Sequence, residues 1–437
     1  MKSRKLITSS FLIVAMAVSA FGQGSTSSAT YKTLKEAYKG IFLIGCADDL
    51  TSNNEAYQKS IKEQYDIVTP ENCMKPGSLH ATQDTYNFTT SDAMVNWCEK
   101  NGLKVWGHTL GWHSQTGQWF FQTDSANAAQ AAAAPAQRPA GAPGQGAPGQ
   151  GGMGQGQRPA GAPGQGAPGQ GGMGQGQRPA GAPAGGGFGG FGGGNQGPQA
   201  LKEVILARLK SHIMTVVGRY KGRIYGWDVF NESIADNGDN TTENLRTFSW
   251  YKAVGPEVLP LAFKWAHEAD PKARLYYNDY NIEQGAVAGN GKHASSMILL
   301  KRLIKEGAPI TGVGIQGHWH LDTNLADVEK AIEDYASLGL KVSITELDVT
   351  ATGDNSGAMG VNQGSSVIPP ENFIKQAEVY KKLFEIFMRH KKDIERVTFW
   401  GLSDTRSWRR GQAALLFDGD LKPKPAYQAV IDASKSK

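Results

Sequence analysis

Three consecutive segments decide the fold: IYGWDVFN (Ile224 to Asn231), PEVLPLAFKWAHEA (Pro256 to Ala269) and RLYYND (Arg274 to Asp279). The first and third are short and rich in apolar and aromatic residues, so they predict buried strands. The middle segment is longer and amphipathic, which predicts a helix. A strand, a helix and a second strand in this order are typical of a βαβ unit in a parallel sheet.

The same alternation continues on both sides of this unit. Predicted strands lie at Ile41–Ala47, Ile67–Asn72, Lys104–His108, Ile224–Asn231, Arg274–Asp279, Val313–Gln316, Val342–Asp348 and Val397–Trp400. Predicted helices include Leu201–Val217, Pro256–Ala269, Ser295–Glu306, Ala326–Ser337, Phe373–Arg389 and Pro425–Ala433. Eight strands alternating with helices predict an α/β fold of the (β/α)8 TIM-barrel type. No glycine-rich dinucleotide fingerprint follows the first strand, which disfavours an open doubly wound sheet.

The chain is interrupted by a segment of different composition. Of its 437 residues, 40% are hydrophobic and 19% charged, which excludes a fibrous or wholly disordered chain. About half of the 55 glycines and 20 prolines, however, lie in residues 125–200, where QRPAGAPGQG begins at Gln137 and Gln157 and QRPAGAP at Gln177. These repeats lack the aliphatic residues that a packed core needs, so we expect a disordered low-complexity insertion. The predicted organisation is therefore a barrel in two parts, 23–124 and 201–437, around the insertion.

The N-terminus has the pattern of an export signal. Basic residues precede an apolar run from Leu6 to Val18, and small residues follow, which predicts a signal peptide over residues 1–22. We expect a secreted protein, extracellular or periplasmic, with no membrane span in the mature chain; a retained N-terminal anchor is the alternative. The cysteines Cys46, Cys73 and Cys98 are odd in number and have apolar neighbours, which favours buried free thiols.

The charge of the chain is unevenly placed. The formal net charge is +5, and three basic residues lie in the signal segment and three arginines in the repeats, which leaves 5 − 3 − 3 = −1 for the rest. The folded part is near neutral, so we expect no nucleic acid or anionic lipid as partner. We also expect a monomer.

The residues that end the predicted strands are unusually polar. Glu232 follows the fourth strand and Glu346 lies at the end of the seventh. Because reactive groups of a TIM barrel gather where the strands end, these two carboxyl groups are expected to face one cleft. Cleavage of a glycosidic bond needs such a pair, one as acid and one as carboxylate, about 5 to 5.5 Å apart in a retaining enzyme. Two solvated strand-end residues or ion-pair partners are the alternative interpretation.

Tryptophans accompany these carboxyl groups. Indole faces stack on sugar rings, so their concentration near strand ends indicates a carbohydrate cleft. We expect Trp106 and Trp227, which lie inside strands, to belong to the core instead. The seven tryptophans are Trp106, Trp112, Trp119, Trp227, Trp319, Trp400 and Trp408.

Seven blocks of sequence then match a known pattern. They are TPENCMKP (Thr69 to Pro76), GHTLGWHSQ (Gly107 to Gln115), WDVFNE (Trp227 to Glu232), YYNDYN (Tyr276 to Asn281), GIQGHWH (Gly314 to His320), ITELDV (Ile344 to Val349) and FWGLSD (Phe399 to Asp404). In this order they resemble glycoside hydrolase family 10 endo-β-1,4-xylanases. The resemblance extends from about Leu34 to the C-terminus, except for the insertion, and implies a retaining hydrolase of xylan with Glu346 as nucleophile and Glu232 as acid/base.

The resemblance also implies a role for further residues. Asn231 would bind the 2-hydroxyl of the sugar being cleaved, Gln316 would hold the region around the two glutamates, and Tyr280 would serve the aglycone side. His318 and Asp348 resemble a pair that orients the nucleophile. The glycone side would be lined by Glu71, Asn72, Lys75, His108, Trp112, Gln115, Trp400 and Trp408.

Two other classes of function remain open at this point. A noncatalytic polysaccharide-binding barrel would normally have lost one of the glutamates, and both are present. The His318-x-His320 spacing suggests a metal-dependent barrel enzyme, but no further ligands are evident, so we expect neither a metal nor a cofactor. The chain departs from the family pattern at Gly111, Gly117, Ala414 and Cys73, and most of all in the insertion, which is expected to leave the reactive face of the barrel and to gate long substrates or tether the enzyme to a surface.

Overall fold

The computed structural model describes residues 33–133, 198–236, 241–247, 250–352 and 367–436. The predicted signal peptide over residues 1–22 and the three repeats lie outside these ranges. Within the described residues no helix combines the length and the apolar character needed to cross a membrane.

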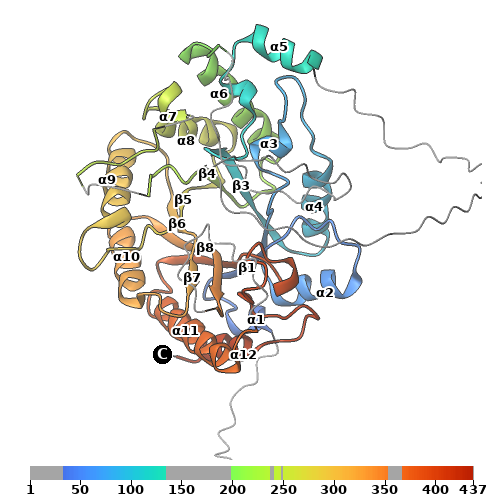
Figure 1. Ribbon diagram of the computed structural model, residues 1–437, viewed down its shortest axis with the longest axis vertical. Helices are drawn as coiled ribbons and strands as arrows, with labels where there is room; N and C mark the ends of the chain where they lie inside the picture. The colour runs from blue at the N-terminus through green and yellow to red at the C-terminus, as the bar shows by residue number, and fades with distance from the viewer. Residues whose placement is uncertain (1–32, 134–197, 237–240, 248–249, 353–366, 437) are drawn as a thin grey trace, which may run out of the picture.

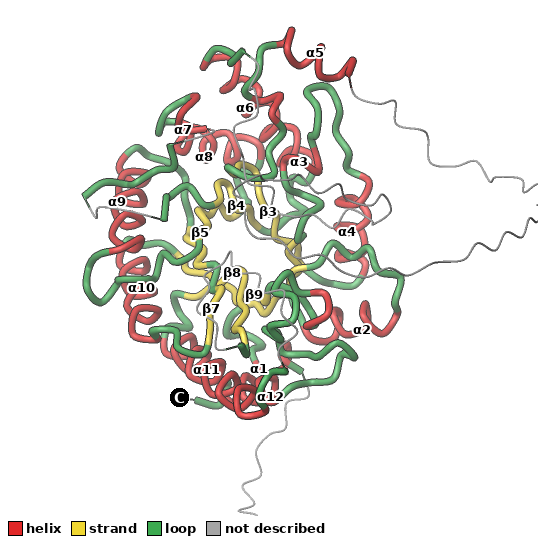
Figure 2. The backbone as a smooth tube through the Cα atoms, in the orientation of Figure 1, coloured by secondary structure: helices red, strands yellow, loops and turns green. Residues whose placement is uncertain are grey.

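Eight parallel strands form a closed barrel, as predicted. Neighbours around the ring follow the order β1-β2-β3-β4-β5-β6-β8-β9, and pairing of β1 with β9 closes it. Figure 2 shows the strands as a central ring with the helices outside. The strands are β1 (Leu43–Ala47), β2 (Ile67–Thr69), β3 (Lys104–Trp112), β4 (Gly226–Asn231), β5 (Arg274–Asp279), β6 (Gly312–Ile315), β8 (Lys341–Thr350) and β9 (Ile394–Phe399).

The helices that cover the ring include all six predicted from the sequence, with bounds shifted by a few residues. Those six are α6 (Lys202–Arg219), α8 (Val258–Ala269), α9 (Gly291–Lys305), α10 (Leu325–Ser337), α11 (Pro370–Arg389) and α12 (Pro425–Ala433). The remaining helices are α1 (Leu34–Ala37), α2 (Glu55–Gln64), α3 (Pro76–Leu79), α4 (Thr89–Lys100), α5 (Asp124–Ala133) and α7 (Trp250–Ala253), with short 3₁₀ turns η1 (Gln118–Phe120) and η2 (Asp404–Arg406).

One short strand was not predicted. After β6 the chain bends at Gly317, whose φ of 79° is a conformation that glycine adopts without a steric penalty. It then forms β7 (His318–His320), which pairs in parallel with the end of β8 and sets His318 opposite Asp348. The bend thus brings a histidine of one strand beside the carboxyl-terminal end of the next.

Four of the seven tryptophans are packing residues. Trp106 and Trp227 are buried in the core, as predicted. Trp119 and Trp319 pack in the hydrophobic core as well and do not line a sugar cleft, contrary to expectation: their indole N–H groups donate to the carbonyl of His80 and to Glu283. The three cysteines are free and buried, as predicted.

The two ends of the predicted insertion lie side by side. The amide of Thr123 donates to the carbonyl of Pro198, and the amide of Ala200 donates to the carbonyl of Phe121, at 2.9 and 2.8 Å. Arg208 of α6 fixes this junction by donating to the carbonyls of Trp119, Phe120 and Gln122. Figure 1 shows α5, which begins the segment, at the periphery beyond α6 rather than over the ring of strands.

Candidate active site

Glu232, directly after β4, and Glu346, within β8, lie in one hydrogen-bonded group. The side-chain nitrogen Nδ2 of Asn278, at the end of β5, donates to Glu346 Oε1 at 2.8 Å and to Asn231 Oδ1 at 2.9 Å. Asn231 in turn donates to Glu232 Oε1 at 3.2 Å. Two amide side chains therefore join the two carboxylates, although 114 positions separate them in the sequence.

Glu346 is buried yet held as a carboxylate. Burial alone would raise its pKa, but the hydrogen bond from His318, the charges of His108 and His318 and the hydrogen bond from Asn278 outweigh it and hold the pKa of Glu346 below its usual range. His318 Nε2 lies 3.3 Å from Glu346 Oε2. A buried, ionised carboxylate with fixed donors is suited to act as a nucleophile.

His318 is itself held in the charged form by a second carboxylate. Its Nδ1 lies 2.9 Å from Asp348 Oδ2, so both ring nitrogens face carboxylate oxygens. Burial lowers the pKa of His318, but Asp348 and Glu346 raise it further, to about 9. Asp348 also accepts from the Trp408 indole at 2.9 Å and from Arg409 Nε at 3.2 Å, which together with His318 keep its pKa low despite burial.

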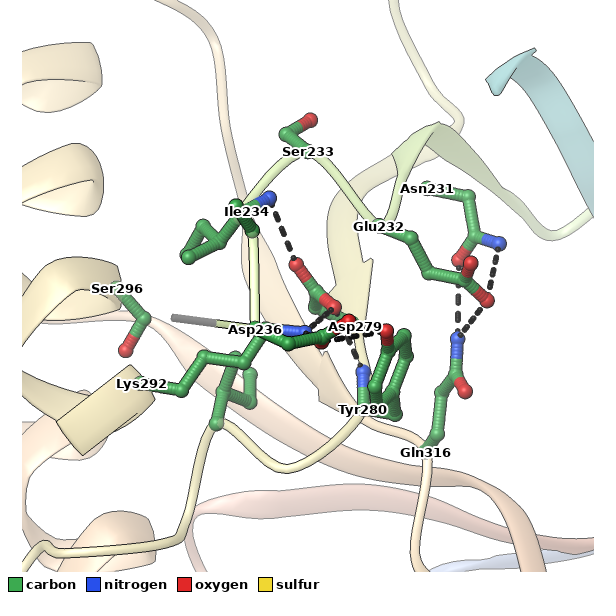
Figure 3. Close-up of polar contacts among 12 residues, drawn as sticks. Asn231, Glu232, Ser233, Ile234, Asp236, Asp279, Tyr280, Lys292, Ser296 and Gln316 are labelled. Atoms are coloured by element: carbon green, nitrogen blue, oxygen red, sulfur yellow. Dashed lines mark hydrogen bonds and ion pairs between the residues drawn. The ribbon is translucent and has the colours of Figure 1, made fainter. Parts of the chain in front are cut away.

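Glu232 occupies a more open position with different donors. Its Oε2 accepts from the Trp112 indole at 2.9 Å. Its Oε1 accepts from Gln316 Nε2 at 2.9 Å, as Figure 3 shows. Its side chain keeps 15% of its surface exposed, against 7% for Glu346. Of the two carboxyl groups, Glu232 is therefore the one that can exchange a proton with a leaving group or with water.

Lys75 lies on the predicted glycone side. It is buried, its ammonium donates to Asn72 Oδ1 at 3.2 Å, and it sits 5.1 Å from the centre of the Trp112 ring. Burial lowers its pKa while the charges of Glu346 and Glu71 oppose that effect. The pKa of Glu71 is raised to about 7 by burial and by Asp49, against the opposing charge of Lys75.

Two further predicted glycone-side residues, His108 and Trp400, contact each other. His108 Nδ1 lies 2.9 Å from Asp228 Oδ2, and its ring meets Trp400 edge to face at 5.3 Å between ring centres. Since Nδ1 faces Asp228, the other ring nitrogen of His108 is directed away from this carboxylate. Asp228 also accepts from the Trp106 indole, so the barrel core orients His108.

Two of the predicted site residues lie apart from this group. Tyr280 lies on the other side of Glu232, where its hydroxyl donates to Asp236 (Figure 3). The same hydroxyl accepts from Arg246. Gln115 has an exposed side chain, and its carbonyl accepts from the amide of Gly77 at 2.6 Å, so its contact with sugar stays a prediction.

Three residues of the site were not predicted. Asn278 lies near the end of the fifth predicted strand, but the sequence assigns it no role, although a strand-end position is the signal that identified Glu346. Arg246 and Arg409 reach the site from loops, and no strand end or motif indicates them. His320 pairs with Asp322, and among the described residues no cluster of three or more histidine, cysteine, aspartate or glutamate side chains could hold a metal ion.

The fold and the site together define a class of protein. A buried nucleophilic carboxylate and a more exposed carboxyl group at the mouth of a TIM barrel, surrounded by indoles, amides and a lysine, form the machinery of a glycoside hydrolase. The family model described as "Glycosyl hydrolase family 10" matches residues 33–136 and 194–433, and leaves out most of the repeats. The chain belongs to this family.

Named relatives and solved structures agree with this assignment. A beta-1,4-xylanase of Dictyoglomus thermophilum is 33% identical over 407 residues, which cover 91% of this chain and 90% of that protein. Endo-1,4-beta-xylanase A of Thermoanaerobacterium saccharolyticum is 32% identical over 92% of this chain, but the match spans only 28% of that longer protein. A mutant of an intracellular xylanase of the same organism, solved with xylotriose, superimposes with a TM-score of 0.68 at 30% identity, covering 91% of this chain and 97% of that one.

Proposed function

We propose that this protein is an endo-1,4-β-xylanase that hydrolyses internal bonds of xylan with retention of configuration. The observation that carries the proposal is the pair Glu232 and Glu346, joined through Asn231 and Asn278 at the mouth of the barrel. The relative that is matched over 90% of its length and the one matched over 28% are both named xylanases, and one similar solved structure holds xylotriose. These findings support xylan as substrate.

The reaction divides between the two carboxyl groups. Glu346 attacks the anomeric carbon and forms a glycosyl-enzyme ester, while Glu232 donates a proton to the departing sugar oxygen. Glu232 then accepts a proton from water, which attacks the anomeric carbon and releases Glu346. The donors around Glu346 stabilise the carboxylate before attack and again when the ester is cleaved.

Substitution of each glutamate tests the proposal. We expect Glu346→Ala to abolish turnover of all glycosides, with a loss of roughly 10⁴-fold or more, because no other group can form the ester. Glu232→Ala is expected to reduce kcat/KM on xylan far more than on aryl xylobiosides with activated leaving groups, which need no protonation.

Kinetics and product analysis provide the measurements. Initial rates on linear xylan and on a series of aryl xylobiosides give the loss of kcat/KM on each kind of substrate. NMR of the first product reports its configuration. Equal losses for Glu232→Ala on both kinds of substrate would contradict its role as acid/base. An α-configured first product would contradict the retaining mechanism.

We also propose that the protein is exported and acts as a monomer. The basic start and apolar run of the N-terminus support export, whereas one similar xylanase is described as intracellular. Fractionation of cells that express the full chain, with N-terminal sequencing of the exported form, tests this proposal. Retention of the uncleaved chain in the cytoplasm would overturn it, and light scattering decides the oligomeric state.

A further inference from the structure

Glu232 has an unusual backbone conformation. Its φ is 54°, in the left-handed region that a side chain other than glycine rarely adopts. Its amide donates to the carbonyl of Asn278 at 2.9 Å, and its carbonyl accepts from Arg246 Nε at 2.8 Å. Trp112, Gln316 and Asn231 hold the carboxyl group itself, whereas its backbone is held by two hydrogen bonds, one to the Asn278 carbonyl of β5 and one from the side chain of Arg246.

Arg246 is positioned by the fold of the loop after β4. Ile234 and Leu245 form an antiparallel bridge, and the amide of Arg246 donates to the carbonyl of Ser233 at 2.9 Å. This return of the chain places residue 246 beside residue 232. Arg246 is buried, at 8% exposure for the residue, so its contacts are made where water competes little.

The same guanidinium reaches the aglycone side. Arg246 Nη2 donates to the hydroxyl of Tyr280 at 2.8 Å, and that hydroxyl donates to Asp236 at 2.5 Å (Figure 3). Lys292 lies 3.5 Å from the centre of the Tyr280 ring and pairs with the buried Asp279 at 2.9 Å. Lys292 and the Arg246 guanidinium, 5.9 Å from the ring centre, both lie over the Tyr280 ring and fix its orientation.

We propose that Arg246 is a positioning residue that holds the acid/base Glu232 and the aglycone-side Tyr280 in one fixed geometry. Two donors of the planar guanidinium, Nε and Nη2, bind the carbonyl of Glu232 and the hydroxyl of Tyr280, and lysine, with a single ammonium, cannot reproduce both bonds in that geometry. The leaving sugar is thus held by Tyr280 while Glu232 delivers the proton to its oxygen. This inference rests on the proposed function.

The consequence is a defect that depends on the leaving group. In Arg246→Lys we expect kcat/KM on xylan to fall about 10- to 100-fold, because a displaced acid or leaving sugar raises the barrier for a poor leaving group. On an aryl xylobioside with an activated leaving group, which needs no proton and has no aglycone sugar, the loss is expected to stay within about threefold. Tyr280→Phe, which removes the hydroxyl but keeps the ring, should show a smaller defect of the same kind.

Arg208→Lys is the matched control. Arg208 has the same exposure as Arg246 and also donates to backbone carbonyls, but it does so at the junction of the insertion, away from Glu232. We expect this variant to lower the Tm without changing the ratio of the two rates. The Tm of Arg246→Lys is measured in parallel, and rates are compared where both variants are folded.

The outcomes separate the two proposals. Selective loss on xylan in Arg246→Lys, absent in Arg208→Lys, supports the inference. Equal losses on both substrates, or no loss at all, overturn it while the wild-type protein still hydrolyses xylan. Failure of the wild-type protein to hydrolyse xylan would instead refute the proposed function itself.

Discussion

At the scale of single residues, the site depends on how buried charges are paired. Glu346 and Asp348 lie on the same strand, two positions apart, and His318 on β7 bridges them with its two ring nitrogens. The imidazolium keeps the nucleophile ionised although it is buried. A neutral side chain at position 318 would leave two buried carboxylates without this compensating charge.

His318→Gln is therefore expected to shift the pH dependence of activity. The nucleophile must be ionised, and its pKa is depressed in the folded protein, so activity is lost as the pH falls through that pKa. Removing the positive charge raises the pKa, and the acidic limb of kcat/KM should move upward by roughly 1 to 3 pH units. The pH profile on an activated aryl xylobioside measures the shift.

His320→Gln is the control for this prediction. His320 lies two residues away and pairs with Asp322, outside the group that contacts Glu346. Its substitution should leave the acidic limb in place. An unmoved limb in His318→Gln would show that the imidazolium does not set the ionisation of the nucleophile.

The site residues that could be predicted from the sequence are those that lie at the ends of predicted strands. Glu232, Glu346 and Asn231 follow from the rule that the reactive groups of a barrel lie where its strands end, and the structure joins them. Arg246 could not be predicted this way, because a loop that folds back on itself brings it to Glu232. The burial of Trp119 was also missed, since an indole beyond a strand end can face either the cleft or a helix.

At the scale of elements, α6 carries a second histidine with an unusual environment. His212 is fully buried, its Nδ1 lies 3.3 Å from His80 Nδ1, and Phe120 of η1 packs against its ring. Burial and the neighbouring His80 lower the pKa of His212 to about 3. The packing of α6 on η1 thus requires a neutral imidazole.

We expect this histidine to destabilise the protein in acid. The pKa of His212 in the folded protein lies below the unfolded value of about 6.5. Its contribution to the free energy of unfolding is therefore complete above about pH 6.5 and is lost as the pH falls toward 3. Between pH 7 and 4.5 the loss is about 2 to 3 kcal/mol. His212→Leu should reduce the pH dependence of the free energy of unfolding by about that amount.

Urea unfolding at both pH values provides the measurement. Because the leucine changes packing, the comparison is the difference between pH 7 and 4.5 within each protein and not the absolute stability. His267→Gln, at an exposed position of α8, is the control and should leave that difference unchanged. If His212→Leu keeps the pH dependence of the wild-type protein, the buried neutral His212 is not the cause of the loss of stability in acid.

Strand bounds show where sequence patterns fail at this scale. The strand predicted to end at His108 continues to Trp112, because Gly111 and Trp112 keep pairing with Phe230 and Asn231 of β4. The apolar pattern indicates where a strand begins, but its partner decides how far it runs. For the same reason β7, which is only three residues long and pairs across a bend, gave no recognisable pattern.

At the scale of the whole molecule, the two ends of the insertion meet at one junction on the barrel. The chain leaves and re-enters at Thr123 and Pro198, which are hydrogen-bonded to each other, and Arg208 fixes the junction. Deletion of residues 137–193 should therefore keep the Tm within about 2 °C and leave kcat/KM on aryl xylobiosides unchanged, since a short connection can span the remaining ends.

Activity on polymeric xylan tests whether the insertion gates long substrates or tethers the enzyme to a surface. In contrast to the gating expected from the sequence, we expect the shortened chain to match the full chain within about twofold, because α5 starts at the periphery and not over the strands (Figure 1). A loss confined to the polymer would contradict this expectation. Replacement of the same residues by a Gly/Ser segment of equal length would then distinguish sequence from length.

The seam between β1 and β9 has a consequence for biosynthesis. Gly45 pairs with Thr398, and Tyr38 donates to the carbonyl of Val430, so the first and last parts of the barrel hold each other. A ribosome must finish almost the entire polypeptide before the ring can shut. Until then the edge strands of the incomplete sheet keep unpaired backbone groups exposed to other chains. We expect chaperones that bind such strands to determine the yield of active enzyme in a production host.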